Sequence, residues 1–469
     1  MANSAKVLSM FLVAMCCIFA LPRASRAQEG KIDVDFSKVV GIIRPLNGVN
    51  DGPIVTRGAF DLSPSYSELG IKHIRLHDVP WTYEDAVDIN YLFPRFDADI
   101  NDPKNYDFSL TDYYLKTIFA LGAQVTFRLG YSAEWAYHPL IHNAPPSDYA
   151  KWAAICVNVI KHYNDGWANG YHYNIKYWEI WNEPDGQSFW GGTPEEYYRL
   201  YEVTSKAIKA YDPNLKVGGP TLASSVPFLE GFLAYGKSHN FPLDFASWHM
   251  YASQPKDVVA KAAKVQELLD KYGFSKAESV LDEWNYFPGD WHSQEVDAKY
   301  RKELFVTQMG GPPGASYDAS VLIGLQDSSV AIADFYQGTN MFWGGLFDEF
   351  GVPFKAFFTF KAFKSLLATP QRVSVTGSDV NGVAAIAGLS ADQSEATILI
   401  SNFGTQCRQY HLTLRGLPWK GSFTYEKYAV DGHHDLDLVK SEKITSTTLA
   451  TAEDVETPSV CLLRLRKSP

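Results

Sequence analysis

The chain has 469 residues, of which 46% are hydrophobic and 20% are charged. A chain of this length can form one large domain and a second, smaller one, and the composition is typical of a globular protein. The formal net charge of −11 argues against binding to nucleic acid or to an anionic membrane surface, because both of these partners are negatively charged.

The first 27 residues have the features of a secretory signal peptide. Lys6 supplies a positive charge, residues 7–21 are apolar, and Ser25-Arg26-Ala27 fits a small-x-small cleavage site. The apolar run is shorter than the roughly 20 residues that a membrane-spanning helix needs, so a cleaved signal is favoured over a membrane anchor. We therefore expect cleavage after Ala27 and a secreted or periplasmic location.

Residues 31–368 are predicted to form a (β/α)8 TIM barrel, because strand-like and helix-like stretches alternate along them. Strands are expected at residues 40–49, 73–77, 124–129, 177–181, 216–219, 244–251, 279–286 and 330–336. Helices are expected at residues 62–69, 110–121, 146–163, 194–211, 226–238, 257–272, 298–309, 317–325 and 355–367. Eight strands are the number that this α/β fold requires.

Residues 370–469 are predicted to form an appended antiparallel β-sandwich, because short strand-like runs follow one another with little helix between them. These runs lie at residues 373–375, 383–390, 395–402, 409–414, 421–430 and 460–465. The run at residues 31–38 is a candidate to join the sandwich. Cys407 and Cys461 fall in this region and could form a disulfide bond, whereas Cys156 is expected to pack within a helix.

Two glutamates each follow an apolar run at a predicted strand end. Glu183 lies in YWEIWNEPD, residues 177–185, and Glu283 lies in SVLDEWNY, residues 279–286. They end the fourth and seventh predicted strands, and active sites of (β/α)8 barrels are built at these carboxyl ends. Paired carboxylates cleave glycosides, one giving a proton to the leaving oxygen and the other attacking or activating water. The pair therefore predicts a glycoside hydrolase, with two structural acids as the alternative.

The pattern resembles that of the retaining (β/α)8 glycoside hydrolases, and in detail that of glycoside hydrolase family 39, which includes β-xylosidases and α-L-iduronidases. The segments that carry the resemblance are Arg75-Leu76-His77-Asp78, Trp181-Asn182-Glu183-Pro184-Asp185, Trp248-His249-Met250-Tyr251, Asp282-Glu283-Trp284-Asn285, Gly345-Leu346-Phe347-Asp348 and Phe354-Lys355-Ala356-Phe357. The resemblance covers roughly residues 31–469. It implies that Glu183 is the general acid/base, that Glu283 is the nucleophile and that the anomeric configuration is retained. Asn182 is well placed for the hydroxyl next to the anomeric carbon.

Further side chains near the predicted strand ends are candidates for substrate binding. They are Arg75, His77, Asp78, His249, Tyr251, Trp284, Trp343 and Asp348. Arg75 could orient the nucleophile or form a structural ion pair, and Tyr251 could donate a hydrogen bond to the nucleophile. Trp284 and Trp343 could stack on a sugar or pack in the core, and Asp348 could bind a hydroxyl or cap a turn.

The residues after His249 indicate a neutral sugar. The resemblance implies that iduronidases of this family place a lysine shortly after this histidine to hold the uronate, because a buried carboxylate needs a charged partner. Here Met250-Tyr251-Ala252-Ser253 follows, and the first cation is Lys256. We expect a β-xylosidase, with an iduronidase-like, arabinosidase, galactosidase or exopolysaccharide-cleaving enzyme as alternatives.

Other classes of protein are weighed against this prediction. A catalytically silent carbohydrate-binding protein would not need both glutamates, whereas a transglycosylase would use the same intermediate. A metalloenzyme is disfavoured, because His73 and His77 on one strand would lie roughly 13 Å apart and Pro139 interrupts the other HxxxH spacing. We expect no metal or other cofactor, a carbohydrate substrate as the partner, and neither nucleic acid nor membrane.

Overall fold

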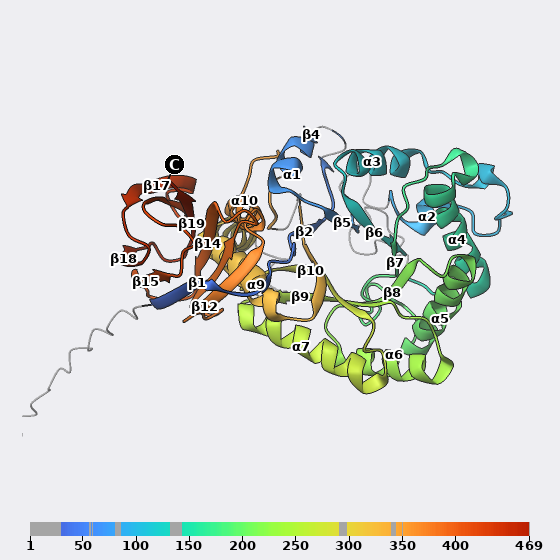
Figure 1. The fold of residues 1–469 in the computed structure, drawn as a ribbon. Coiled ribbons are helices and arrows are strands. Elements are labelled where there is room, and N and C mark those ends of the chain that lie inside the picture. The colour runs from blue at the N-terminus through green and yellow to red at the C-terminus, as the bar shows by residue number, and fades with distance from the viewer. Residues whose placement is uncertain are drawn as a thin grey trace, which may run out of the picture.

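The computed structural model describes residues 30–55, 58, 60–79, 86–131, 143–289, 298–338, 344–348 and 350–468. These residues form a closed eight-stranded barrel with helices around it and, beside it, a nine-stranded sheet (Figure 1). The predicted fold class is thereby confirmed. The predicted signal peptide and Trp343 lie outside the described residues. Within the described ranges, no helix has the length and apolar character needed to cross a membrane.

The barrel strands are parallel and hydrogen-bonded in the order β10-β11-β2-β5-β6-β7-β8-β9. They are β2 (Gly48–Asn50), β5 (His73–Leu76), β6 (Gln124–Leu129), β7 (Tyr177–Ile180), β8 (Lys216–Leu222), β9 (Phe245–Ala252), β10 (Glu278–Tyr286) and β11 (Val330–Phe335). The strands are short and largely buried, as expected for parallel strands that are covered by helices. The predicted first strand, residues 40–49, was wrong in its start, because only Gly48–Asn50 enters the barrel.

The helices surround the barrel (Figure 1). They are α1 (Ser63–Leu69), α2 (Ile89–Leu92), α3 (Ser109–Ala120), α4 (Tyr149–Asp165), α5 (Pro194–Tyr211), α6 (Val226–His239), α7 (Pro255–Tyr272), α8 (Ala298–Lys302), the π-helix η5 (Glu303–Met309), α9 (Pro312–Gly324) and α10 (Lys355–Leu367). Helix α5 begins with a capping box, in which Thr193 accepts from the Glu196 N–H and Glu196 accepts from the Thr193 N–H. These bonds satisfy N–H groups that have no partner within the helix.

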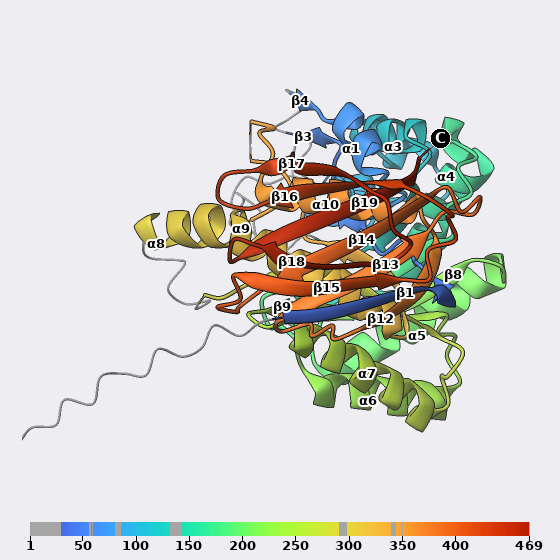
Figure 2. The ribbon, with the colours of Figure 1, turned by 60° about the vertical axis from the view of Figure 1, so that its left-hand side comes forward.

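The second sheet has the strand order β17-β16-β19-β14-β13-β12-β1-β15-β18 (Figure 2). Its strands are β1 (Gly30–Ile42), β12 (Gln371–Thr376), β13 (Val383–Leu389), β14 (Glu395–Asn402), β15 (Gln409–Arg415), β16 (Phe423–Val430), β17 (Asp435–Ile444), β18 (Leu449–Asp454) and β19 (Ser459–Lys467). Strand β1 pairs antiparallel with β12 and parallel with β15. One apolar cluster joins Leu412 on β15 to Tyr425 on β16, so the sheet curls around a shared core.

Helix α9 joins the barrel to the second sheet. The buried ring of Tyr317 on α9 lies 4.9 Å from that of Tyr286 on β10 and 5.7 Å from that of Phe403 after β14. The hydroxyl of Ser401 donates to the carbonyl of Ser316 on α9 at 2.6 Å. Helix α9 thus packs against both the barrel and the sheet, and helix α10 also contacts the sheet, where Lys355 donates to Asp435 on β17 at 2.6 Å.

The three cysteines of the described residues are free and buried. The disulfide bond considered between Cys407 and Cys461 is therefore not formed in this structure. The thiol of Cys407 instead donates to the carbonyl of Gln409 at 3.0 Å.

Candidate active site

The predicted catalytic side chains converge at the carboxyl ends of the barrel strands. Glu183 follows β7, Glu283 lies near the end of β10, and His249 is on the neighbouring β9. The backbone leaves β7 in an uncommon conformation, with φ of 73° at Trp181 and 44° at Glu183. Side-chain-bearing residues rarely adopt positive φ, and such strain often accompanies functional sites.

The two glutamates lie close together. One oxygen of Glu183, one of Glu283 and Nδ1 of His249 all lie within 4.8 Å of one another. Retaining glycosidases place their carboxyl groups about 5–5.5 Å apart, whereas inverting enzymes need about 6.5–9.5 Å to admit a water. The short separation fits direct attack by one carboxylate. The side chain of Glu183 is 16% exposed and that of Glu283 only 5%, so Glu183 is the more accessible to a leaving group.

Glu283 accepts two hydrogen bonds and also lies close to His249. Its Oε1 accepts from Nη1 of Arg75 at 2.7 Å, its Oε2 accepts from the hydroxyl of Tyr251 at 2.7 Å, and Nδ1 of His249 lies 3.3 Å from Oε2. Burial raises the pKa of Glu283, while the positive charges of His249 and Arg75 act in the opposite direction. Burial and the charge of Glu283 raise the pKa of Tyr251 well above its usual value, so its hydroxyl keeps its proton.

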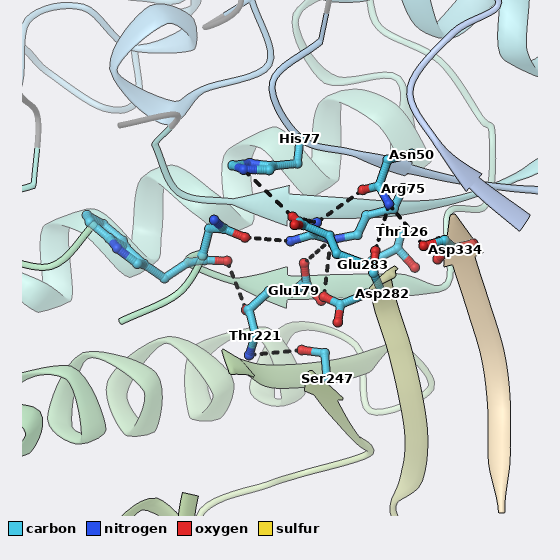
Figure 3. Close-up of polar contacts among 12 residues, drawn as sticks. Asn50, Arg75, His77, Thr126, Glu179, Thr221, Ser247, Asp282, Glu283 and Asp334 are labelled. Carbon is cyan, nitrogen blue, oxygen red and sulfur yellow. Dashed lines mark hydrogen bonds and ion pairs between the residues drawn. The ribbon is translucent and has the colours of Figure 1, made fainter. Parts of the chain in front are cut away.

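Arg75 is the centre of a buried ion-pair network beneath the site (Figure 3). Its Nε donates to Glu179 at 2.7 Å and lies 3.2 Å from Asp282, while Nη1 holds Glu283. Burial lowers the pKa of Arg75, but the three carboxylates outweigh burial and raise it well above the usual value. Arg75 therefore both contacts Glu283, the predicted nucleophile, and takes part in a buried ion-pair network.

The same guanidinium orients Asn182. Nη2 of Arg75 donates to Oδ1 of Asn182 at 2.8 Å, which fixes the direction of the amide. Nδ2 of Asn182 is buried and has no hydrogen-bond partner among the described residues. A buried donor without a partner is costly, so this N–H is well suited to a substrate hydroxyl.

His249 lies between the two glutamates and is buried. Its Nδ1 is 2.6 Å from Oε1 of Glu183, and its Nε2 is 3.6 Å from Oδ2 of Asp282. Burial lowers the pKa of His249, but the charges of Glu283 and Asp282 raise it well above the usual value. This shift favours the imidazolium form, which reduces the repulsion between the two carboxylates.

His77 and Asp78 also border the carboxylate pair. Nε2 of His77 lies 3.3 Å from Asp78 and 3.8 Å from Oε1 of Glu283. Burial and the charges of Arg128 and Arg75 lower the pKa of His77 well below its usual value, so this ring is neutral. The two histidines beside Glu283 thus have pKa values shifted in opposite directions.

Two side chains considered for sugar binding, Trp284 and Asp348, are seen in structural roles. Trp284 is fully buried, with its ring 5.2 Å from Phe335 and 6.5 Å from Phe360. Successive side chains of a strand point to opposite faces, so Trp284 points away from the face that Glu283 occupies. Asp348 caps a turn, accepting the N–H groups of Phe350 at 2.9 Å and Val352 at 2.8 Å. Binding of a sugar by these two side chains stays a prediction, and Trp343 lies outside the described residues.

The network contains residues that the sequence did not single out. Glu179 and Asp282 are acids within apolar strands. This unusual placement could have indicated a buried ion pair, since a buried acid needs a partner. Asn50 carried no such signal. Its Oδ1 accepts from Arg75 at 3.1 Å and its Nδ2 donates to the carbonyl of Asp282 at 2.7 Å, and only the closing of the barrel brings these residues together.

Glu183, His249 and Glu283 offer atoms close enough to share a cation. A ligating imidazole must be deprotonated, and the raised pKa of His249 opposes this. Glu283 is in addition already bonded to a guanidinium and a phenol. These three side chains are therefore better suited to binding protons than to binding a metal ion.

A closed (β/α)8 barrel with two close carboxylates at its strand ends is the arrangement of the retaining glycoside hydrolases. The chain belongs to the glycosyl hydrolases family 39, whose sequence model matches residues 24–303.

Several known proteins are similar to this chain. It is 29% identical over 265 residues to a β-xylosidase of Geobacillus stearothermophilus, covering 50% of this chain and 51% of the relative. It is 25% identical over 313 residues to a β-xylosidase of Caldicellulosiruptor saccharolyticus, covering 61% of this chain and 60% of the relative. The matches span only about half to three-fifths of these curated relatives. Among solved structures, a glucosidase from Croceicoccus marinus matches 94% of this chain and 100% of its own, with 26% identity and a TM-score of 0.78.

Proposed function

We propose that this protein is a retaining glycoside hydrolase that removes a neutral sugar, with β-xylosides as its substrates. The observation that carries the proposal is the pair of glutamates, whose oxygens lie within 4.8 Å of each other at the strand ends of a family 39 barrel. Binding as a silent lectin would not require this spacing.

The proposed reaction has two steps. Glu283 attacks the anomeric carbon while Glu183 gives its proton to the leaving glycosidic oxygen, and a covalent glycosyl-enzyme forms. Glu183, now ionised, then takes a proton from a water that attacks the anomeric carbon and releases Glu283. The two inversions together retain the anomeric configuration. A sugar that intercepts the intermediate in place of water would make the reaction a transglycosylation.

The surrounding residues support these roles. The imidazolium of His249, 2.6 Å from Glu183, stabilises negative charge on Glu183 after the proton has left. The N–H of Asn182 is directed by Arg75 and is available for the hydroxyl next to the anomeric carbon, a contact that strengthens in the transition state. Tyr251 and Arg75 keep Glu283 aligned for attack.

The engagement of nearby cations supports a neutral sugar. Arg75 is committed to carboxylates, and Lys261 donates to the backbone carbonyls of Ala223 and His249. Lys256 is exposed, and its backbone N–H donates to Asn381 of the second sheet. A uronate at the site would therefore compete with the carboxylates bound to Arg75 and with the carbonyls bound to Lys261.

The relatives favour xylose, and the Croceicoccus glucosidase makes glucose the second candidate. The test is a panel of nitrophenyl glycosides carrying β-xylose, β-glucose, arabinose, galactose, glucuronic acid and iduronic acid. We expect the β-xyloside to give the highest kcat/KM and the Glu283→Gln variant to be inactive. Cleavage of uronides alone, or equal turnover by the Glu283→Gln variant, would contradict the proposal.

We also propose that the chain is exported and that its partner is an oligosaccharide or polysaccharide. Residues 1–27, with their charged start, apolar run and small-x-small site, support export. Mass determination of the N-terminus of the exported protein should place its start at Gln28. A start at the initiator methionine in protein purified from culture medium or periplasm would contradict cleavage.

A further inference from the structure

We propose that Asp185 and Lys261 are positioning residues that fix the acid/base Glu183 by clamping residues 221–225, which comprise the end of β8 and the turn before α6. This inference rests on the proposed glycosidase function.

Asp185 ties the loop that carries Glu183 to this turn. It lies two residues after Glu183, and its carboxylate accepts three backbone N–H groups, those of Ala223 at 2.9 Å, Ser224 at 2.9 Å and Ser225 at 2.8 Å. Successive N–H groups at a helix N-terminus form a favourable site for an anion. The loop and the turn are therefore coupled to each other.

Asp185 is not required as the cap of helix α6. The hydroxyl of Ser225 already accepts the N–H of Phe228, the usual bond of an N-cap residue. The bonds of Asp185 reach across from a different segment of the chain. Their effect is to fix the segment from which Asp185 comes, which is the segment of Glu183.

Backbone contacts support the same coupling. The N–H of Glu183 donates to the carbonyl of Thr221 at 3.0 Å, and the hydroxyl of Thr221 donates to the carbonyl of Trp181 at 3.1 Å. Thr221 itself has a positive φ of 58°, and its N–H donates to Ser247 on β9 at 3.1 Å (Figure 3). Thr221 is therefore bonded to both Trp181 and Glu183, and all three residues have a positive φ. Their hydrogen bonds must maintain this unfavourable backbone conformation.

Lys261 connects the other side of the turn to β9. Its ammonium donates to the carbonyl of Ala223 at 3.0 Å and to the carbonyl of His249 at 2.7 Å. His249 in turn contacts Glu183 at 2.6 Å. The contacts thus form a closed circuit. It runs from the loop of Glu183 through Asp185, Ala223, Lys261 and His249 back to Glu183. Burial lowers the pKa of Lys261 to about 8, while the charges of Asp185, Glu183 and Asp282 favour its protonated form.

Loosening this circuit should displace the carboxyl of Glu183 from the leaving oxygen. A misplacement of about 1 Å can cost about 100-fold in rate. The loss should depend on the leaving group, because only a poor leaving group needs the proton of Glu183 as the bond breaks. General destabilisation of the fold would lower activity on all substrates alike.

The test compares kcat/KM for phenyl and dinitrophenyl β-xylosides, since this parameter reports formation of the glycosyl-enzyme. The main variant is Asp185→Asn, which keeps the shape but replaces one of the two acceptor oxygens by an NH2 group, so at least one of the three N–H bonds is lost. Its matched control is Asp148→Asn, which alters a carboxylate cap at α4 that accepts the N–H of Lys151 at 3.0 Å. The second variant is Lys261→Met, with Lys264→Met on the same helix, whose side chain is 42% exposed, as its control.

We expect Asp185→Asn to lose about 100-fold on the phenyl xyloside and less than about threefold on the dinitrophenyl xyloside. Lys261→Met should show the same selectivity with a smaller loss, and both controls should match the wild type. Equal losses on both substrates, or no loss in either variant, would overturn the inference while leaving the glycosidase proposal intact. A wild-type protein that cleaves no glycoside would overturn the proposed function and this inference with it.

Discussion

Asn182 offers the sharpest test of how the site recognises its transition state. Its Oδ1 is bonded to Arg75 at 2.8 Å, and its Nδ2 is buried without a partner among the described residues. Replacing Asn182 by alanine removes one buried, aligned donor from the site. Loss of a comparable donor to a developing transition state costs about 2.7–4 kcal/mol, which is about 100- to 1000-fold in kcat.

The assay is a cycle of two enzymes and two substrates. The wild type and Asn182→Ala are each measured on an aryl β-xyloside and on its analogue that lacks the hydroxyl next to the anomeric carbon. If Nδ2 binds this hydroxyl, the substitution should cost about 100- to 1000-fold on the first substrate and little on the second. Equal losses on both substrates would refute the reasoning.

A control for stability is needed in this cycle. The substitution also removes the acceptor of one N–H of Arg75, and a buried donor left without a partner costs about 1–3 kcal/mol. Thermal unfolding of Asn182→Ala measures this cost separately. A loss of activity that disappears below the unfolding temperature would assign the effect to stability.

Three further predictions concern the ionisable groups. Glu183→Ala should lose about 100- to 10,000-fold on poor leaving groups, whereas on a dinitrophenyl glycoside, which needs no acid help, azide should restore turnover and yield a glycosyl azide of retained configuration, identified by NMR. Tyr251→Phe removes a donor that favours the anion of Glu283, so the pKa of Glu283 should rise and the acid limb of kcat/KM should move to higher pH. Burial raises the pKa of Asp318 on α9 well above its usual value, and neither of its oxygens has a hydrogen-bond partner among the described residues. The native state therefore holds this proton longer than the unfolded state, and stability falls as pH rises from the unfolded pKa towards the folded pKa. Asp318→Asn should remove this loss, so its Tm should exceed that of the wild type by more at pH 8 than at pH 4; an equal difference at both values would contradict it.

The sequence was sufficient for most of the barrel because its strands and helices alternate in hydrophobic pattern. The parts that it missed have physical reasons. Strands β17 and β18 are mostly exposed and polar, so they show little apolar alternation. The first barrel strand, β2, has only three residues, and the preceding strand-like run belongs to β1 in the other sheet. No local pattern distinguishes these two destinations.

The two catalytic candidates could be recognised because each is an acid at a strand end. Their supporting network could not, because it depends on which strands become neighbours and on the direction of each side chain. Trp284 illustrates the second difficulty: it is adjacent to Glu283 in sequence, but its ring is buried between Phe335 and Phe360. Composition alone cannot separate a stacking platform from a core residue one position away.

The position of β1 limits how this protein can be divided for engineering. This strand precedes the barrel in sequence, yet it lies between β12 and β15 in the second sheet. A fragment cut after Leu367, the last residue of α10, would keep β1 but lose both of its neighbours, leaving bare hydrogen-bonding edges beside exposed Val39, Val40 and Ile42. Such an edge promotes aggregation. A minimal catalytic fragment should therefore begin after β1, and a circular permutant should keep β1 contiguous with the second sheet.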